Sequence, residues 1–299
     1  MEHGTITTKR TGSVLTATID NPPINLCNWK FMSDFDSLLS SVTSGDGIKV
    51  LVVQSANPDF FVAHLDLLPR SGKHSHDLPG LFISYSLFAE SNFPEMHPEY
   101  PTLGYFFGLM FKLTNLPVVT IALVEGRARA GGCDFAMAFD MRFGVKGRTF
   151  LSHLEACLGV YASGGGSMRW AQLMGKSRAL EYLYSGTDIE AEEAERYGIL
   201  NRAFETPAAM RMFVDKYTQR VGKFELTALA LTKKRINEAT NASSPETFEK
   251  DFRAFVELLS LPRTSVLVSE IWTVIKGATD CDEERTLPEA LMAMPSYNN

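Results

Sequence analysis

Two carboxylic acids that stand beside apolar segments are the residues of this sequence best placed for acid–base chemistry. Asp134 follows a pair of glycines and a cysteine, and Glu155 follows Leu154, 21 residues after Asp134. Partial burial beside apolar neighbours would raise the pKa of either carboxyl group toward the range that suits proton transfer. A single Asp or Glu is more often a solvated surface group, so the pair gains weight only from its surroundings.

Glycine-rich turns adjoin both acids and could supply backbone amides. One runs from Gly126 to Asp134 and a second covers residues 163–166, each followed by a predicted helix. Glycine lets a backbone amide approach a ligand closely, and the first amides of a helix have no internal partner, so such a turn can bind phosphate or an oxyanion. The turn that begins at Gly126 has no Gly-Lys-Ser/Thr ending and reads Gly-x-x-x-x-Gly-Gly in place of GxGxxG, so it does not match the common nucleotide loops. A tight turn without a ligand remains the alternative.

Alternating strand and helix signals must position these turns. A third candidate turn, residues 60–67, follows a predicted strand directly, and its amide could point into a cleft. Residues 66–99 contain several prolines and read as a long irregular excursion, which is usually functional or mobile. Apolar runs and 3–4 periodicity predict the remaining elements. Strands are expected at 14–19, 50–54, 118–124, 141–145, 150–154 and 199–204, and helices at 29–42, 103–113, 133–139, from 168, and at 190–197.

Beyond Thr206 the pattern changes to helix alone. Glycine becomes scarce, and apolar residues recur at helical spacing over 208–221, 226–239, 248–259 and 266–275. We therefore expect an α/β core at residues 1–206 that holds the site, and a helical region at residues 207–299.

Composition excludes several classes of function. The chain of 299 residues carries a net charge of −6, which argues against nucleic acid and anionic membrane as partners. Four cysteines without a CxxC pair indicate reduced thiols and no metal site. Neither a signal peptide nor a membrane span is recognisable, so an intracellular protein, cytoplasmic or organellar, is expected.

Five segments, taken in order, resemble the crotonase (enoyl-CoA hydratase/isomerase) family. They are IDNPPIN at 19–25, FVAHLDL at 61–67, GRARAGGCD at 126–134, DMR at 140–142 and LEACLG at 154–159, and the resemblance extends over residues 5–240. No single motif is decisive, whereas the ordered set is specific. The resemblance implies a crotonase-like spiral of strand–strand–helix units with a helical C-terminal region that assembles a homotrimer or homohexamer.

The same resemblance assigns roles to individual residues. It implies an acyl-CoA thioester as substrate, with coenzyme A as part of that substrate and no separate cofactor or metal. The amides of Leu65 and Gly131 would form an oxyanion hole, and Asp134 and Glu155 would be the catalytic acid and base. Substrate-binding positions fall on Ala63, His64 and Ser163.

Several departures keep alternatives open. His64 stands where the family has glycine, so an imidazole would enter the thioester site or simply pack, and Arg127 and Arg129 would face CoA phosphates or solvent. The order Asp then Glu resembles the dienoyl-CoA isomerases, which carry a further Asp where this chain has Ser163. Hydration and double-bond isomerisation therefore both remain, and the alternative of another class is a non-catalytic crotonase-fold protein used for binding or assembly.

Overall fold

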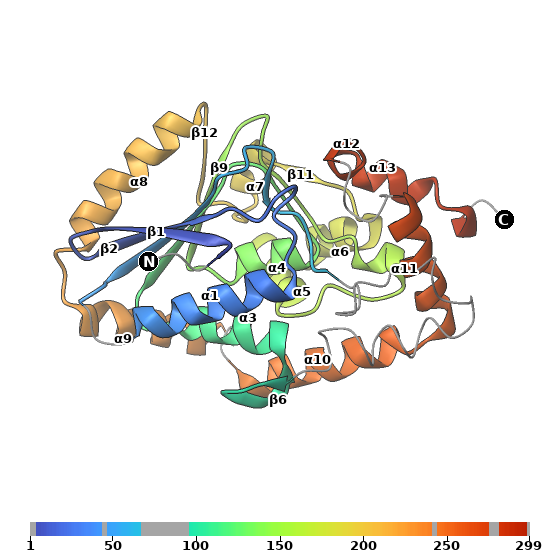
Figure 1. The fold of residues 1–299 in the computed structure, drawn as a ribbon, viewed down its shortest axis with the longest axis horizontal. Coiled ribbons are helices and arrows are strands. Elements are labelled where there is room, and N and C mark those ends of the chain that lie inside the picture. Colours follow the sequence, from blue (N-terminus) through green and yellow to red (C-terminus); the bar gives the residue numbers. More distant parts are fainter. Residues whose placement is uncertain (1–3, 44–46, 67–95, 241–243, 275–280, 298–299) are drawn as a thin grey trace.

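A twisted, mostly parallel sheet forms the larger strand layer of the computed structural model (Figure 1). The structure describes residues 4–43, 47–66, 96–240, 244–274 and 281–297. The strands of this six-stranded sheet lie in the order β1 (Ile6–Thr11), β2 (Val14–Ile19), β3 (Val50–Ser55), β7 (Val119–Val124), β9 (Met141–Val145) and β12 (Arg202–Phe204). Only the β1–β2 pair is antiparallel among these.

Helices cover both faces of this sheet, which explains the four consecutive apolar residues that open β3. Leu51 and Val53 join the core under α1 (Trp29–Val42), whereas Val50 and Val52 pack with residues of α8 (Pro207–Val221). Successive side chains of a strand point to opposite faces. A strand buried on both sides must therefore be apolar throughout.

A smaller sheet carries the turns that the sequence singled out. Its four strands lie in the order β11 (Ile189–Glu190), β10 (Phe150–Ser152), β8 (Arg127–Arg129) and β4 (Phe60–Val62). Each of β4, β8 and β10 follows a strand of the larger sheet, and α4 (Gly131–Met137) begins directly after β8. This repetition of strand, strand and helix confirms the predicted crotonase-like spiral.

The sequence did not predict β8 as a strand, because its residues were read as part of one glycine turn. Gly126 permits the pairing of β8 with β4, since a Cβ at that position would lie 2.3 Å from the carbonyl carbon of Asp59.

Most of the predicted excursion, residues 67–95, lies outside the described residues. After it come the hairpin strands β5 (Met96–His97) and β6 (Tyr100–Gly104), and then α3 (Tyr105–Asn115).

Every described element after β12 is a helix, as the composition change predicted. These helices are α8, α9 (Leu226–Ala239), α10 (Pro245–Leu259), α11 (Pro262–Val274), α12 (Cys281–Arg285) and α13 (Leu287–Met292), followed by a short 3₁₀ turn at Pro295–Tyr297. Figure 1 shows α11, α12 and α13 on the side of the molecule opposite α8. The division into a core and a trimerisation region stays a prediction. None of the described helices combines the length and apolarity that crossing a membrane requires.

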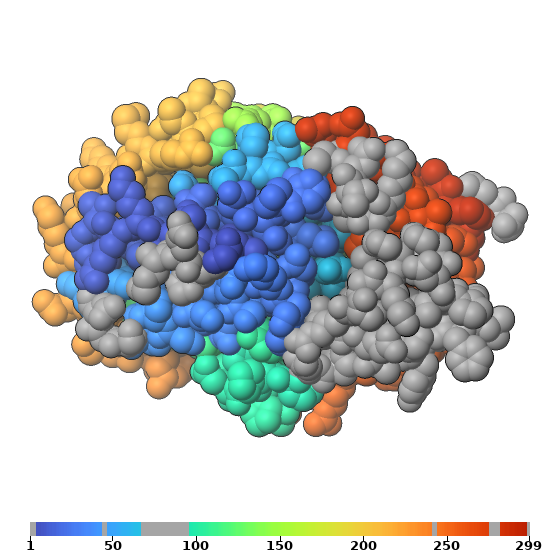
Figure 2. Space-filling model, viewed as in Figure 1, coloured from blue at the N-terminus to red at the C-terminus, as the bar shows by residue number. Residues whose placement is uncertain are grey.

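The C-terminal helices also meet the core at the surface. Figure 2 shows the red C-terminal segment against the light-blue turn between β3 and β4. Arg285 of α12 lies 2.7 Å from the carboxylate of Asp59 in that turn. The apolar faces of α10 and α11, including Phe255 and Trp272, are covered within the chain itself.

Candidate active site

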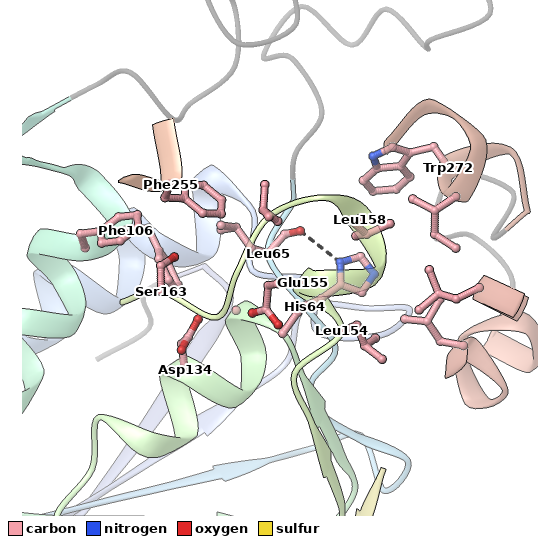
Figure 3. A pocket seen from close by; sticks show the side chains of 17 residues that line it. His64, Leu65, Phe106, Asp134, Leu154, Glu155, Leu158, Ser163, Phe255 and Trp272 are labelled. Atoms are coloured by element: carbon pink, nitrogen blue, oxygen red, sulfur yellow. Dashed lines mark hydrogen bonds between the residues drawn. The ribbon is translucent and has the colours of Figure 1, made fainter. Parts of the chain in front are cut away.

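One apolar pocket collects residues from both parts of the sequence (Figure 3). The core contributes the two predicted acids, Asp134 and Glu155, and both predicted oxyanion positions. The C-terminal helices α10, α11 and α13 contribute Phe255, Trp272 and Leu291 among others. The further lining residues are His64, Phe106, Phe107, Ala130, Leu154, Leu158, Val160, Ser163, Ile271 and Leu287. Such a lining, apolar with a few convergent polar groups, is typical of a small-molecule site.

Leu65 follows β4 and Gly131 follows β8, and the two residues lie next to each other. The amide nitrogen of Leu65 is 3.2 Å from the point that a Cβ on Gly131 would occupy, and the Leu65 Cβ is 2.7 Å from it. Among the described residues, neither amide has a hydrogen-bond acceptor; Gly131 opens α4, where the first N–H groups have no internal partner. Two unpaired N–H groups therefore border the same pocket.

The backbone that presents Gly131 is strained. Ala130 has a φ of 45° and a ψ of −125°, a region that residues with a Cβ rarely adopt. Its own amide donates to the carbonyl of Ser152 in β10 over 2.8 Å. Conformations of this kind persist where surrounding structure enforces them, often at functional sites.

The two predicted acids are both buried at the edge of the pocket. Asp134 is 3% exposed on α4, and Glu155 is 7% exposed as the first residue of the 3₁₀ helix η2 (Glu155–Leu158). A third group, His153, joins them: one ligand-type atom from each of the three side chains lies within 4.8 Å of the others. We call Asp134, His153 and Glu155 the acid cluster.

Each member of the acid cluster has an atom that finds no hydrogen-bond partner among the described residues. These atoms are Asp134 Oδ1, His153 Nε2 and Glu155 Oε2, whereas His153 Nδ1 lies 3.3 Å from Glu155 Oε1. Buried polar groups are normally paired, so three unpaired groups in one place call for a functional explanation.

Burial dominates the electrostatics of the cluster. It raises the pKa of Asp134 well above the usual value; the nearby charge of Glu155 acts in the same direction, and His153 acts against it. For His153, burial disfavours the charged ring, but Cys133 and Glu155 more than offset it, and the pKa lies well above its usual value. Asp134 is therefore suited to carry a proton at neutral pH.

The acid cluster is also the one group of His, Cys, Asp and Glu in the described part of the chain that is compact enough for a cation. His153 already uses Nδ1 in its contact with Glu155. We therefore interpret the three side chains as proton-sharing groups, and the expectation that no metal takes part stays a prediction.

A second polar group surrounds His64 and ties α12 to both amide turns. His64 Nε2 lies 3.0 Å from Glu284 Oε1, and His64 Nδ1 lies 3.0 Å from the carbonyl oxygen of Leu65. Carbonyl and carboxylate oxygens accept hydrogen bonds, so these two contacts favour a ring that carries an N–H on both nitrogens. Burial alone lowers the pKa of His64, but Glu284 more than offsets it and the net shift is upward.

Arg129 completes this group from β8. Its side chain is 2% exposed, pairs with both carboxylate oxygens of Asp188, and donates to the backbone carbonyls of Glu284 and Arg285. We call His64, Glu284, Arg129 and Asp188 the C-terminal clasp. The expectation that Arg129 faces CoA phosphates or solvent is wrong, because its donors are used inside the chain.

Of the three predicted substrate-binding residues, two line the pocket and one does not. His64 and Ser163 line the pocket. Ala63 is 2% exposed and is not a lining residue; its carbonyl oxygen accepts from the Arg129 amide over 3.0 Å. Sequence reasoning missed His153 and Glu284, although a titratable residue within the predicted buried strand at 150–154 was a usable signal for His153.

Comparisons with known proteins show the family of this chain. Residues 98–264 match the family model described as enoyl-CoA hydratase/isomerase. A short-chain-enoyl-CoA hydratase from Clostridium acetobutylicum is 24% identical over 261 residues, which cover 87% of this chain and 91% of that protein. Mitochondrial methylglutaconyl-CoA hydratase of Mus musculus is 26% identical over 167 residues, 56% of this chain and 46% of that protein.

Solved structures extend the similarity to nearly the full chain. A Streptomyces avermitilis protein, provisionally named an enoyl-CoA hydratase, superimposes with a TM-score of 0.83 at 29% identity and covers 98% of both chains. An enoyl-CoA hydratase from Bacillus halodurans shares the fold, with a TM-score of 0.72 at 19% identity over 88% of this chain and 98% of that one. Because the family model matches more than half of the residues of this chain, the chain belongs to the enoyl-CoA hydratase/isomerase family.

Proposed function

We propose that this chain is an enzyme that adds water across the double bond of an unsaturated acyl-CoA. The observation that carries the proposal is the meeting of two unpaired amides, Leu65 and Gly131, with two buried carboxyl groups at one apolar pocket. Groups within 4.8 Å of each other can hold a single water between them, since two ordinary hydrogen bonds span about 5.5 Å.

The chemistry follows from that arrangement. The thioester carbonyl would accept from both amides, and each such donor is worth about 3 kcal/mol to the enolate that forms. The water oxygen bonds to the β-carbon while Glu155 takes one water proton, and Asp134 gives its proton to the α-carbon. Transfer of the proton from Glu155 to Asp134 then restores the starting state.

Double-bond isomerisation is the second candidate, because the order Asp134 then Glu155 resembles the dienoyl-CoA isomerases. Those enzymes carry a third carboxylate where this chain has Ser163, and Ser163 lines the pocket. A serine hydroxyl does not ionise near neutral pH and cannot take that role as a base on its own. This difference favours hydration.

The pocket is suited to an uncharged acyl group. Of the lining residues that the structure describes, His64 is the basic one, and its charge is already paired with Glu284. A second carboxylate on the substrate would enter an apolar enclosure beside two acids without a free cation to pair with, which is costly. We therefore propose monocarboxylic enoyl-CoA substrates.

The test is a panel of 2-enoyl-CoA and dienoyl-CoA substrates followed by mass spectrometry. We expect a product heavier by one water molecule from the 2-enoyl substrates. A rearranged product of unchanged mass would replace hydration by isomerisation. Stabilisation of the protein by acyl-CoA without any turnover would favour the non-catalytic alternative, because a ligand of the native state raises the melting temperature whether or not it reacts.

We also propose that the chain assembles as a homotrimer or homohexamer. Large apolar side chains remain exposed on α8 and α9, namely Met212 (71%), Leu231 (56%) and Ile236 (58%). Large apolar residues that stay exposed on helices are typical of a surface that another subunit covers. Light scattering at micromolar concentration should give the mass of three or six chains, and a monomer mass would contradict the proposal.

A further inference from the structure

His153 is buried behind the two acids and does not reach the pocket. The side chain is 1% exposed, and the residue lies between β10 and η2. Its Nδ1 is 3.3 Å from Glu155 Oε1, and the indole of Trp170 packs edge-on against the ring with the centroids 4.8 Å apart. A residue in this place can influence Glu155 without touching a substrate.

Asp134 approaches the same imidazole over the start of α5 (Gly166–Met174). A Cβ on Gly166 would lie 2.2 Å from Asp134 Oδ1 and 2.6 Å from His153 Cε1, so only glycine lets both side chains converge there. Asp134 Oδ1 and His153 Nε2 are both without a hydrogen-bond partner among the described residues. The imidazole thus has one carboxyl group bonded to it and a second one nearby.

Charge balance limits the protonation states that this cluster can hold. Two carboxylates in a buried site repel each other, and each carries a desolvation cost, so one of them keeps its proton unless cations compensate. The other titratable or charged groups that face the cluster are Cys133 on α4, Arg169 on α5 and Asp251 on α10. Burial raises the pKa of Cys133, so it is a neutral thiol, and Arg169 acts on Asp251 as well as on Asp134.

We propose that His153 is a positioning residue that fixes which acid is the base: as an imidazolium it holds Glu155 ionised through Nδ1–H and leaves the proton on Asp134. The assignment rests on the proposed function, because it gives the two carboxyl groups of that reaction different tasks. One cation and one carboxylate then compensate each other, and the cluster as a whole is neutral. The upward pKa shift of Asp134 agrees with this state, and the charge of Glu155 acts in the direction that raises the pKa of His153.

The main test is the pH profile of His153→Asn with an enoyl-CoA that the wild type hydrates. Asparagine can still donate a hydrogen bond toward Glu155 but carries no charge. A neighbouring cation lowers the pKa of both carboxyl groups, so its removal raises both. We therefore expect the acidic and the alkaline limbs of kcat/KM to move to higher pH by about one unit or more.

The kinetic constants separate positioning from substrate contact. On the acidic limb, a shift of one unit lowers kcat about tenfold at a given pH, while KM should stay within about twofold. The matched control is His97→Asn. His97 is also fully buried, lies 3.6 Å from the carboxylate of Asp36 and does not line the pocket. This control should lower stability at most and leave both limbs in place.

Nitrogen-15 NMR of histidine in the wild-type protein covers the case in which His153→Asn does not fold. His153 should show both ring nitrogens protonated at about pH 8, where a free histidine is neutral. A neutral His153 ring at that pH, or a wild-type pH profile in folded His153→Asn, would overturn the assignment. If the wild type turns over no enoyl-CoA at all, the proposed function fails instead, and the NMR result still decides the charge of His153.

Discussion

The acid cluster and the C-terminal clasp are two buried polar groups on one pocket, and each pairs a histidine with a glutamate. They differ in how completely their atoms are bonded. In the clasp, both nitrogens of His64 and the donors of Arg129 have acceptors. In the acid cluster, Asp134, His153 and Glu155 each keep an atom without a partner among the described residues.

This difference in hydrogen bonding indicates that the clasp serves the stability of the fold and that the acid cluster serves the reaction. Each fully bonded buried group recovers its desolvation cost, whereas an unbonded one leaves that cost in place. A cost of this kind is expected where the missing partner is a substrate or a water that reacts. We expect substitutions in the acid cluster to act mainly on turnover, and substitutions in the clasp to act mainly on stability.

The largest effect is expected from Gly131→Val, which acts at the backbone between the two groups. A Cβ at Gly131 would lie 2.7 Å from the Cβ of Leu65, so both amide turns must move. Because the two amides serve the same oxygen, kcat/KM should fall about 10³-fold. Gly131→Ala should give an intermediate loss, and equal activity of both variants with the wild type would remove the oxyanion hole from the mechanism.

The next effect tests the acid cluster directly. Glu155→Gln and Asp134→Asn should each lower kcat about 10²-fold or more, as the loss of a general acid or base does. The melting temperature of Asp134→Asn should stay the same or rise, since this substitution removes an acid from a buried and incompletely bonded site, whereas Glu155→Gln removes the carboxylate beside His153 and should lower it. Near-wild-type turnover in both variants would end the assignment of these carboxyl groups as acid and base.

Glu284→Gln is the corresponding change in the clasp. It removes the carboxylate that pairs with His64, and the free energy of unfolding should fall by about 1–3 kcal/mol. The loss is no larger because the imidazole ring can release its proton when the carboxylate is gone. Chemical denaturation measures that loss, while kcat should stay within a few-fold of the wild type. The control is Glu289→Gln on the exposed face of α13, which should change neither quantity. A 10²-fold loss of kcat in Glu284→Gln would make the clasp part of the catalytic machinery.

The smallest effect is a pH dependence of the clasp. The pKa of His64 is raised in the folded protein, so the folded state binds the proton more tightly than the unfolded one. The contribution of His64 to stability is therefore complete below its unfolded pKa of about 6.5 and is lost as pH rises through the folded value. The difference in unfolding free energy between the wild type and His64→Gln should shrink from pH 6 toward pH 9, and a constant difference would contradict the charged pair.

Local pattern was sufficient for the longer buried strands, for most of the helices and for the two acids. The predicted strand at 14–19 and helix at 29–42 coincide with β2 and α1. Asp134 and Glu155 were singled out because each adjoins an apolar run, and both are buried at the pocket. The short strand β8 was missed because three residues beside glycines carry too little periodicity to be distinguished from a turn.

What the sequence determined by itself is therefore the order of strands and helices, the helical C-terminal region, and the acids beside their glycine turns. These features depend on neighbours within a few residues, where side-chain periodicity and backbone freedom act. Only the tertiary structure decided that His153 stands behind both acids and that Glu284 meets His64 across 220 residues of chain. Contacts of that range depend on how whole helices pack, and the residue types alone do not encode whether a buried polar atom finds a partner.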